Sequence, residues 1–138
     1  MIVADTGAIL ALVDADDRHH RALLELFERD PDWILPWAIL PEIHYLLSSH
    51  VGPDAELAFL RDLAEGRYAV ESGNETDLAR AYELCNRYWD LRLGLVDGVV
   101  VAVAERLGAT AIATLDEWHF GAIEIRGKPK LLPRDLVT

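Results

Sequence analysis

The chain alternates short apolar runs with longer amphipathic stretches, beginning with Ile2 to Ala4. Four further runs have the length and composition of short strands. They are WILP (33–36), RYAVES (67–72), ATAIATL (109–115) and GAIEI (121–125). The last two are predicted to be strands on either side of a short turn.

Between these runs, apolar residues recur at helical spacing. The predicted helices cover 8–13, 22–29, 39–47, 57–64, 78–89 and 95–107. Asn74 and Asp77 form the sequence signature of a capping box before the fifth helix. One face of that helix is predicted to carry an apolar stripe of Leu78, Ala81, Tyr82, Cys85, Tyr88 and Trp89. Strands that alternate with helices in this way favour an α/β fold whose parallel sheet is covered on both faces.

Composition narrows the class of protein. The 138 residues suit one domain, 1–138, and the hydrophobic fraction of 51% argues against disorder. The longest apolar stretches are interrupted by Asp5 or Asp97, so no membrane span is expected. A single cysteine, Cys85, and the absence of a signal-peptide pattern favour a cytoplasmic location. The net charge of -11 by itself disfavours binding to nucleic acid or to acidic membranes.

Four acids stand out by their positions. Asp5 follows the first predicted strand and Asp116 follows ATAIATL, and open α/β sheets bind ligands at the carboxyl ends of their strands. Glu42 and Asp97 lie on predicted helices next to apolar residues, where a carboxylate needs a compensating cation. Without one, at least one of the four should have a raised pKa. The alternative is structural: each Asp could cap a helix, and the negative charge of Glu42 could be stabilised by the helix dipole in a first turn.

These residues lie in segments that resemble the successive acidic motifs of PIN-domain ribonucleases, in particular VapC-type toxins. The segments are VADTGAILALV, LPEIHYLL, LGLVDGVVVAVAERLGA and ATLDEWHF. The resemblance implies a three-layer fold with a short, mainly parallel central sheet, and an endoribonuclease site of Asp5, Glu42, Asp97 and Asp116. Thr6 and Thr114 would be supporting hydroxyls. Family members often carry a further acid just after the position of Asp97, where this chain has Gly98, Val99 and Val100.

The expected cofactor is Mg²⁺ or Mn²⁺, because carboxylates are hard ligands that suit these ions. Bound metal would also convert an acidic pocket into a phosphate-binding site for RNA. The resemblance further implies a cognate antitoxin, a homodimer and a toxin–antitoxin hetero-oligomer. The helices at 22–27 and 57–63 are candidate contact surfaces, with core packing as the alternative.

Other functions fit less well. A phosphatase would need a second Asp where Gly7 stands, and a signalling receiver would need a Lys before Lys128. A non-catalytic scaffold that only binds an antitoxin stays open. Zinc is not expected, because His19, His20 and His44 lack partners at ligand spacing.

Two aromatic residues and one arginine near the acids have open roles. Arg92 could contact RNA or lie solvated at a helix end, and Trp118 could stack on a base. Phe120 is expected to anchor the turn in the core.

Overall fold

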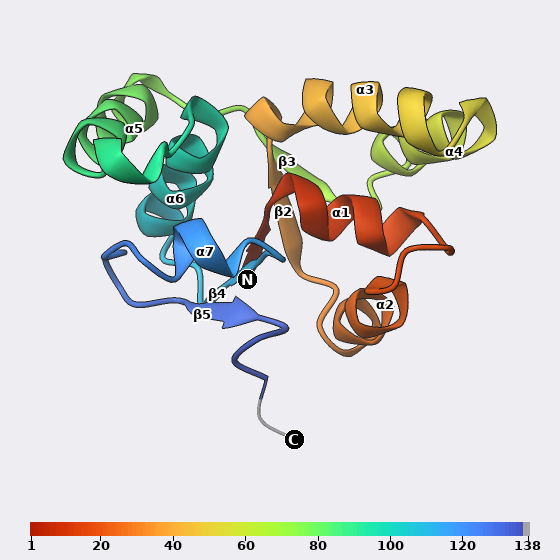
Figure 1. Ribbon diagram of the computed structural model, residues 1–138. Helices are drawn as coiled ribbons and strands as arrows, with labels where there is room; N and C mark the ends of the chain where they lie inside the picture. Colours follow the sequence, from red (N-terminus) through yellow and green to blue (C-terminus); the bar gives the residue numbers. More distant parts are fainter. Residues whose placement is uncertain (137–138) are drawn as a thin grey trace.

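The computed structural model describes residues 1–136 as a five-stranded parallel sheet flanked by helices (Figure 1). The strands are β1 (Ile2–Ala4), β2 (Trp33–Pro36), β3 (Ala69–Glu71), β4 (Ala111–Ala113) and β5 (Lys130–Leu132). The helices are α1 (Thr6–Val13), α2 (His20–Arg29), α3 (Leu40–His50), α4 (Pro53–Ala64), α5 (Glu75–Arg87), α6 (Leu95–Leu107) and α7 (Glu117–Phe120). Two short 3-10 turns, η1 (Trp37–Ile39) and η2 (Trp89–Leu91), precede α3 and follow α5. The last two residues of the expected domain 1–138 lie outside the described part.

The strand order β3-β2-β1-β4-β5 creates a topological switch point in the sheet. From β1 the chain moves outward through β2 to β3, and it then crosses back to β4 and continues to β5. Because crossovers between parallel strands are right-handed, this reversal places α5 and α6 on one side of the sheet and α1 and α2 on the other (Figure 1). The carboxyl ends of β1 and β4 therefore flank the place where α/β sheets bind ligands. The predicted three-layer fold with a parallel sheet is confirmed.

The core lies against both faces of the central strands. All three residues of β1 and all three of β4 are buried, which explains why these strands are continuously apolar. Helix α6 is buried from Gly98 to Ala104 and packs against β1 and β2. Within residues 1–136, no helix combines the length and the apolar character that crossing a bilayer requires.

The prediction that the apolar stripe of α5 is its buried face is wrong. The helix buries Asp77, Ala81 and Leu84, while Leu78 is 57% and Tyr82 71% exposed. The reason is the close approach of α6: a Cβ at Gly98 would lie only 3.0 Å from Cβ of Ala81. Only small residues fit at this crossing, so the large apolar side chains lie outside it.

Two other expectations also need correction. The segment GAIEI (121–125) is not a strand, although Ile123 and Ile125 are buried. It follows α7 directly, and the chain needs a longer connection before β5 can pair in parallel with β4. Helix α4 buries Phe59, whereas Leu57 and Leu60, whose helical spacing in the sequence predicts an apolar face, are exposed.

Candidate functional site

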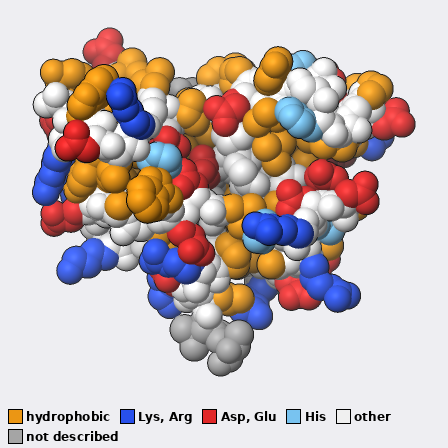
Figure 2. Space-filling view, in the orientation of Figure 1, with side chains coloured by type: hydrophobic (Ala, Val, Ile, Leu, Met, Phe, Trp, Pro, Cys, Tyr) orange, Lys and Arg blue, Asp and Glu red, His pale blue; other side chains and the backbone are white. Residues whose placement is uncertain are grey.

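The acids Asp5, Glu42, Asp97 and Asp116 line one open hollow at the switch point. Its volume is about 390 Å³, and Thr6, Gly7, Leu10, Leu46 and Leu115 complete the lining. Figure 2 shows acidic side chains at the central hollow between the two halves of the molecule. The elements β1, α3, α6 and β4 thus bring together acids that are far apart in the sequence.

Asp5 is the most enclosed of these acids, with 7% of its surface exposed. It occupies the N-cap of α1, yet its side chain makes no capping hydrogen bond, so a capping role does not explain it. The pKa of Asp5 is raised from 3.8 to about 6, chiefly by burial and in smaller part by the nearby Asp97 and Asp116. The backbone N–H of Thr6 and the hydroxyl of Thr114, which donates to Oδ2 at 3.1 Å, act in the opposite direction. The expectation of a raised pKa in the group is confirmed, and burial is its main cause.

Asp97 lies in the first turn of α6, where it is the third residue rather than the cap. Its Oδ2 accepts a hydrogen bond of 3.1 Å from the backbone N–H of Gly94, which is the N-cap. Burial raises the pKa of Asp97, against the effect of this hydrogen bond, and Asp116 adds to the increase. Asp97 therefore has a structural role as well as a position in the hollow.

Of the four acids, Asp116 is the one whose side chain caps a helix from the N-cap position. Its Oδ1 accepts from the backbone N–H of His119 at 3.0 Å, and its Oδ2 lies 2.7 Å from Nδ1 of the His119 ring. The other ring nitrogen, Nε2, lies 2.9 Å from the carbonyl oxygen of Leu91. The hydrogen bond to Asp116 is the main cause of the raised pKa of His119. Sequence reasoning missed His119, although an ionisable residue three positions after a capping acid is a usable signal.

Glu42 differs from the other three. It is exposed in the first turn of α3, so the expectation that it borders an apolar face at a desolvation cost is wrong. Its place on the wall of the hollow is nevertheless the predicted one.

The donor set suits a hard divalent cation, although the side chains do not yet converge on one point. Among residues 1–136, no three Asp, Glu, His or Cys side chains are grouped as in a formed metal site. All four acids line the same hollow, and no Lys or Arg is among its lining residues. The buried hydroxyl Oγ1 of Thr6, on the same wall, has no hydrogen-bond partner in the described structure. These residues fit a hydrated Mg²⁺ or Mn²⁺, which keeps several of its waters.

The other residues singled out from the sequence are also placed. Phe120 is 1% exposed, which confirms that it anchors the turn in the core. Trp118 is 74% exposed. Arg92 follows η2 with a left-handed backbone, φ 55°, and its guanidinium lies over the ring of Trp89.

Comparison with known proteins gives the family. The model of the PIN domain matches residues 2–124. Ribonuclease VapC26 of Mycobacterium tuberculosis is 35% identical over 124 residues, which is 88% of this chain and 91% of that protein.

Two solved structures have the same fold. VapC20 of Mycobacterium tuberculosis, a sarcin–ricin-loop-cleaving toxin, superposes with a TM-score of 0.79 and 22% identity over 90% of this chain and 97% of its own. FitAcB from Neisseria gonorrhoeae has a TM-score of 0.64 and 15% identity over 95% and 96%. The family match, the relative and the acids at the switch point agree: the chain belongs to the PIN-domain family, as a homologue of the VapC ribonucleases.

Proposed function

We propose that this protein is a Mg²⁺- or Mn²⁺-dependent endoribonuclease that acts as the toxin of a toxin–antitoxin pair. The observation that carries the proposal is a single hollow at the switch point that acids from four separate elements line, with no Lys or Arg among the lining residues. The VapC ribonuclease homology supports RNA as the substrate. The proposed place of action is the cytoplasm.

Asp5, Glu42, Asp97 and Asp116 would hold the metal, with Asp5 as the central ligand because it is the most enclosed. When bound, a divalent cation lowers the pKa of a nucleophilic water and neutralises the charge that builds on the phosphoryl oxygens. The hydroxyl of Thr114 orients Asp5, and His119 holds Asp116. Such partners of ligating carboxylates fix their orientation.

The test of this activity is RNA cleavage by the purified protein with Mg²⁺ or Mn²⁺ and with a chelator. We expect cleavage only with metal, and products that carry a 5′-phosphate and a 3′-hydroxyl. Cyclic phosphate ends produced in the presence of chelator would contradict the proposal, because they indicate metal-free acid–base chemistry. Absence of cleavage on all RNAs would favour the non-catalytic scaffold.

The partner would be a small antitoxin that lays an apolar helix on the toxin and brings a cation to the acids. Of the two candidate surfaces, α4 suits this role better, because Leu57 and Leu60 are exposed. Helix α2 buries Leu23, Leu26 and Phe27, so core packing accounts for it. We propose a homodimer and a hetero-oligomer with the antitoxin. A strictly monomeric protein in light scattering, encoded without a neighbouring partner gene, would contradict this.

A further inference from the structure

We infer that Trp89, Arg92 and Trp118 form a stacking surface for unpaired RNA bases beside the acid hollow. These three residues are called the tryptophan platform below. The inference rests on the proposed ribonuclease function, and it names residues that bind the substrate next to the scissile bond.

Trp89 and Arg92 form one preformed unit. Trp89 is 65% exposed in η2, and the guanidinium of Arg92 lies 5.3 Å from the centre of its ring. Arg92 is exposed, and among residues 1–136 no carboxylate is within ion-pair distance of it. A left-handed backbone is unfavourable for an arginine, yet the chain adopts it at the position that brings this group to the indole. An indole and a guanidinium both offer flat faces on which a base can stack.

Trp118 supplies a second exposed ring on the neighbouring segment. It is the second residue of α7 and is 74% exposed. The hydrogen bond between Nε2 of His119 and the carbonyl oxygen of Leu91 joins the two segments. Leu91 lies between Trp89 and Arg92 in the sequence, and His119 follows Trp118, so this bond holds the two segments that carry the platform residues next to each other. Figure 2 shows hydrophobic side chains on the face over α5 and α7, beside the central hollow.

The same two segments also carry two of the acids. Asp116 is two residues before Trp118, and its carboxylate contacts the His119 ring. Asp97 accepts from the backbone N–H of Gly94, two residues after Arg92. An RNA strand whose phosphate lies at the acids can therefore place a neighbouring base on the platform. Bases of single-stranded loops are free to do so, whereas bases inside a duplex are not.

The negative charge of the molecule indicates that its affinity for RNA comes from base stacking and not from a basic groove. The chain has a net charge of -11, and the acids Asp90 and Glu117 lie on the platform segments themselves. Binding that depends on lysines and arginines would be weak here and steeply dependent on salt. Stacking of bases on aromatic rings needs no net positive charge and tolerates different base sequences.

The experiment measures steady-state cleavage and direct binding for a set of point variants. Binding is followed by fluorescence anisotropy of a labelled single-stranded oligouridylate, with Mg²⁺ present in the Asp97→Asn background so that the probe stays intact. The variants are Trp89→Ala, Trp89→Phe, Arg92→Ala and Trp118→Ala. Trp37→Ala is the matched control, because Trp37 is 60% exposed and lines a different hollow, with Leu78.

We expect Trp89→Ala and Trp118→Ala each to raise KM and the Kd for oligouridylate about tenfold, with kcat changed less than about twofold. Trp89→Phe should keep most of the affinity, because it keeps a stacking face, and Trp37→Ala should bind as wild type does. Annealing the RNA to its complement should remove the difference between wild type and Trp89→Ala.

Two results would overturn the inference. One is that wild type cleaves RNA and the platform variants show the same KM and Kd as wild type. The other is unchanged RNA binding with loss of binding to a co-expressed antitoxin, which would assign the platform to a protein partner. If wild type cleaves no RNA but its binding of oligouridylate depends on Trp89 and Trp118, the proposed nuclease function fails and the platform stands.

Discussion

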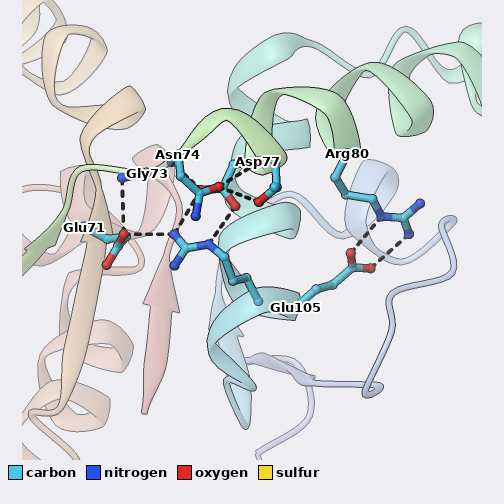
Figure 3. A network of polar contacts seen from close by, with 8 residues as sticks. Glu71, Gly73, Asn74, Asp77, Arg80 and Glu105 are labelled. Carbon is cyan, nitrogen blue, oxygen red and sulfur yellow. Dashed lines mark hydrogen bonds and ion pairs between the residues drawn. The ribbon is translucent and has the colours of Figure 1, made fainter.

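Acidic side chains gather in two regions of this protein, and the two regions treat them in opposite ways. At the switch point, Asp5 and Asp97 are desolvated and have no cationic partner among the hollow's lining residues. Between α5, α6 and β3, three other acids are paired with arginines (Figure 3). The first region raises the pKa values of Asp5 and Asp97, whereas the second lowers those of Glu71 and Glu105.

The paired region consists of two neighbouring groups, one around Arg106 and one around Arg80. Arg106 donates to Asp77 at 2.8 and 2.9 Å and to Glu71 at 2.9 Å. Its hydrogen bond is the main cause of the lowered pKa of Glu71, followed by the backbone N–H of Gly73. Burial is the largest single influence on Glu105 and raises its pKa. The hydrogen bonds from Arg80 at 2.8 and 3.0 Å, the bond from the backbone N–H of Arg126 at 2.9 Å and the charges of both arginines together outweigh it.

The difference teaches how to separate structural acids from functional ones in this fold. Both regions desolvate carboxylates, so burial does not distinguish them. What distinguishes them is whether the protein itself supplies the positive charge. Where it does, the acids join elements of the fold; where it does not, the unpaired charge is available for a cation from outside.

The largest expected effect comes from replacing one of the unpaired acids at the switch point. Asp97→Asn should reduce RNA cleavage more than about 100-fold, beyond the loss typical of groups that only orient a metal ligand. The metal-free variant should be as stable as wild type or more stable, because Asn still accepts from Gly94 while one negative charge is removed. Added Mn²⁺ should stabilise the variant less than wild type. Paired thermal melts with chelator and with Mn²⁺ measure this, and an equal response to metal would remove Asp97 from the site.

The next largest effect is the loss of stability when an arginine of the paired region is removed. Arg106→Met should lower the free energy of unfolding by about 3 kcal/mol, because it leaves Asp77, 3% exposed, without its cation. The matched control is Arg87→Met, whose pair with Glu124 is exposed on both sides and contributes less than about 1 kcal/mol. Urea denaturation of both variants gives the two values. Similar losses in the free energy of unfolding for the two variants would show that burial of Asp77 does not make its ion pair more stabilising than an exposed one.

The pH dependence of stability tests whether Asp5 is buried without a compensating charge. Because its folded pKa of about 6 lies above its ordinary value of 3.8, folding favours the protonated form. Wild-type stability should therefore fall as pH rises from about 4 to 6, by at most about 3 kcal/mol. In the presence of chelator, Asp5→Asn should be more stable than wild type at pH 7, and the difference should vanish below about pH 4. A difference that stays constant between pH 4 and pH 7 in urea titrations argues against burial of a charged Asp5.

The smallest effect concerns Glu42. As an exposed side chain, it should change stability by less than about 0.5 kcal/mol when replaced in Glu42→Gln without metal. Its contribution should become visible only with Mn²⁺, as a smaller increase in Tm than wild type shows. Calorimetry with and without metal tests this, and Glu56→Gln, on α4 and outside the hollow, is the control.

The sequence by itself determined most of the elements and the acids that follow β1 and β4. Each strand that precedes Asp5 and Asp116 is a continuous apolar run, and the alternation of strands with helices implies parallel pairing. Parallel strands that leave an acid at their carboxyl ends must place these acids at one edge of the sheet. The capping box of Asn74 and Asp77 was equally readable, because its hydrogen bonds span only three residues.

Only the tertiary structure decided which faces are covered and which charges are paired. No local pattern shows that Gly98 brings α6 so close to Ala81 that the large side chains of α5 remain outside. The pair of Arg106 and Asp77 joins residues 29 apart, and the bond from His119 to Leu91 joins residues 28 apart. The partner of β4 is β5 rather than GAIEI, because the chain needs the intervening turns to return for parallel pairing. These features depend on contacts between distant segments, and such contacts exist only once the sheet and its helices have assembled.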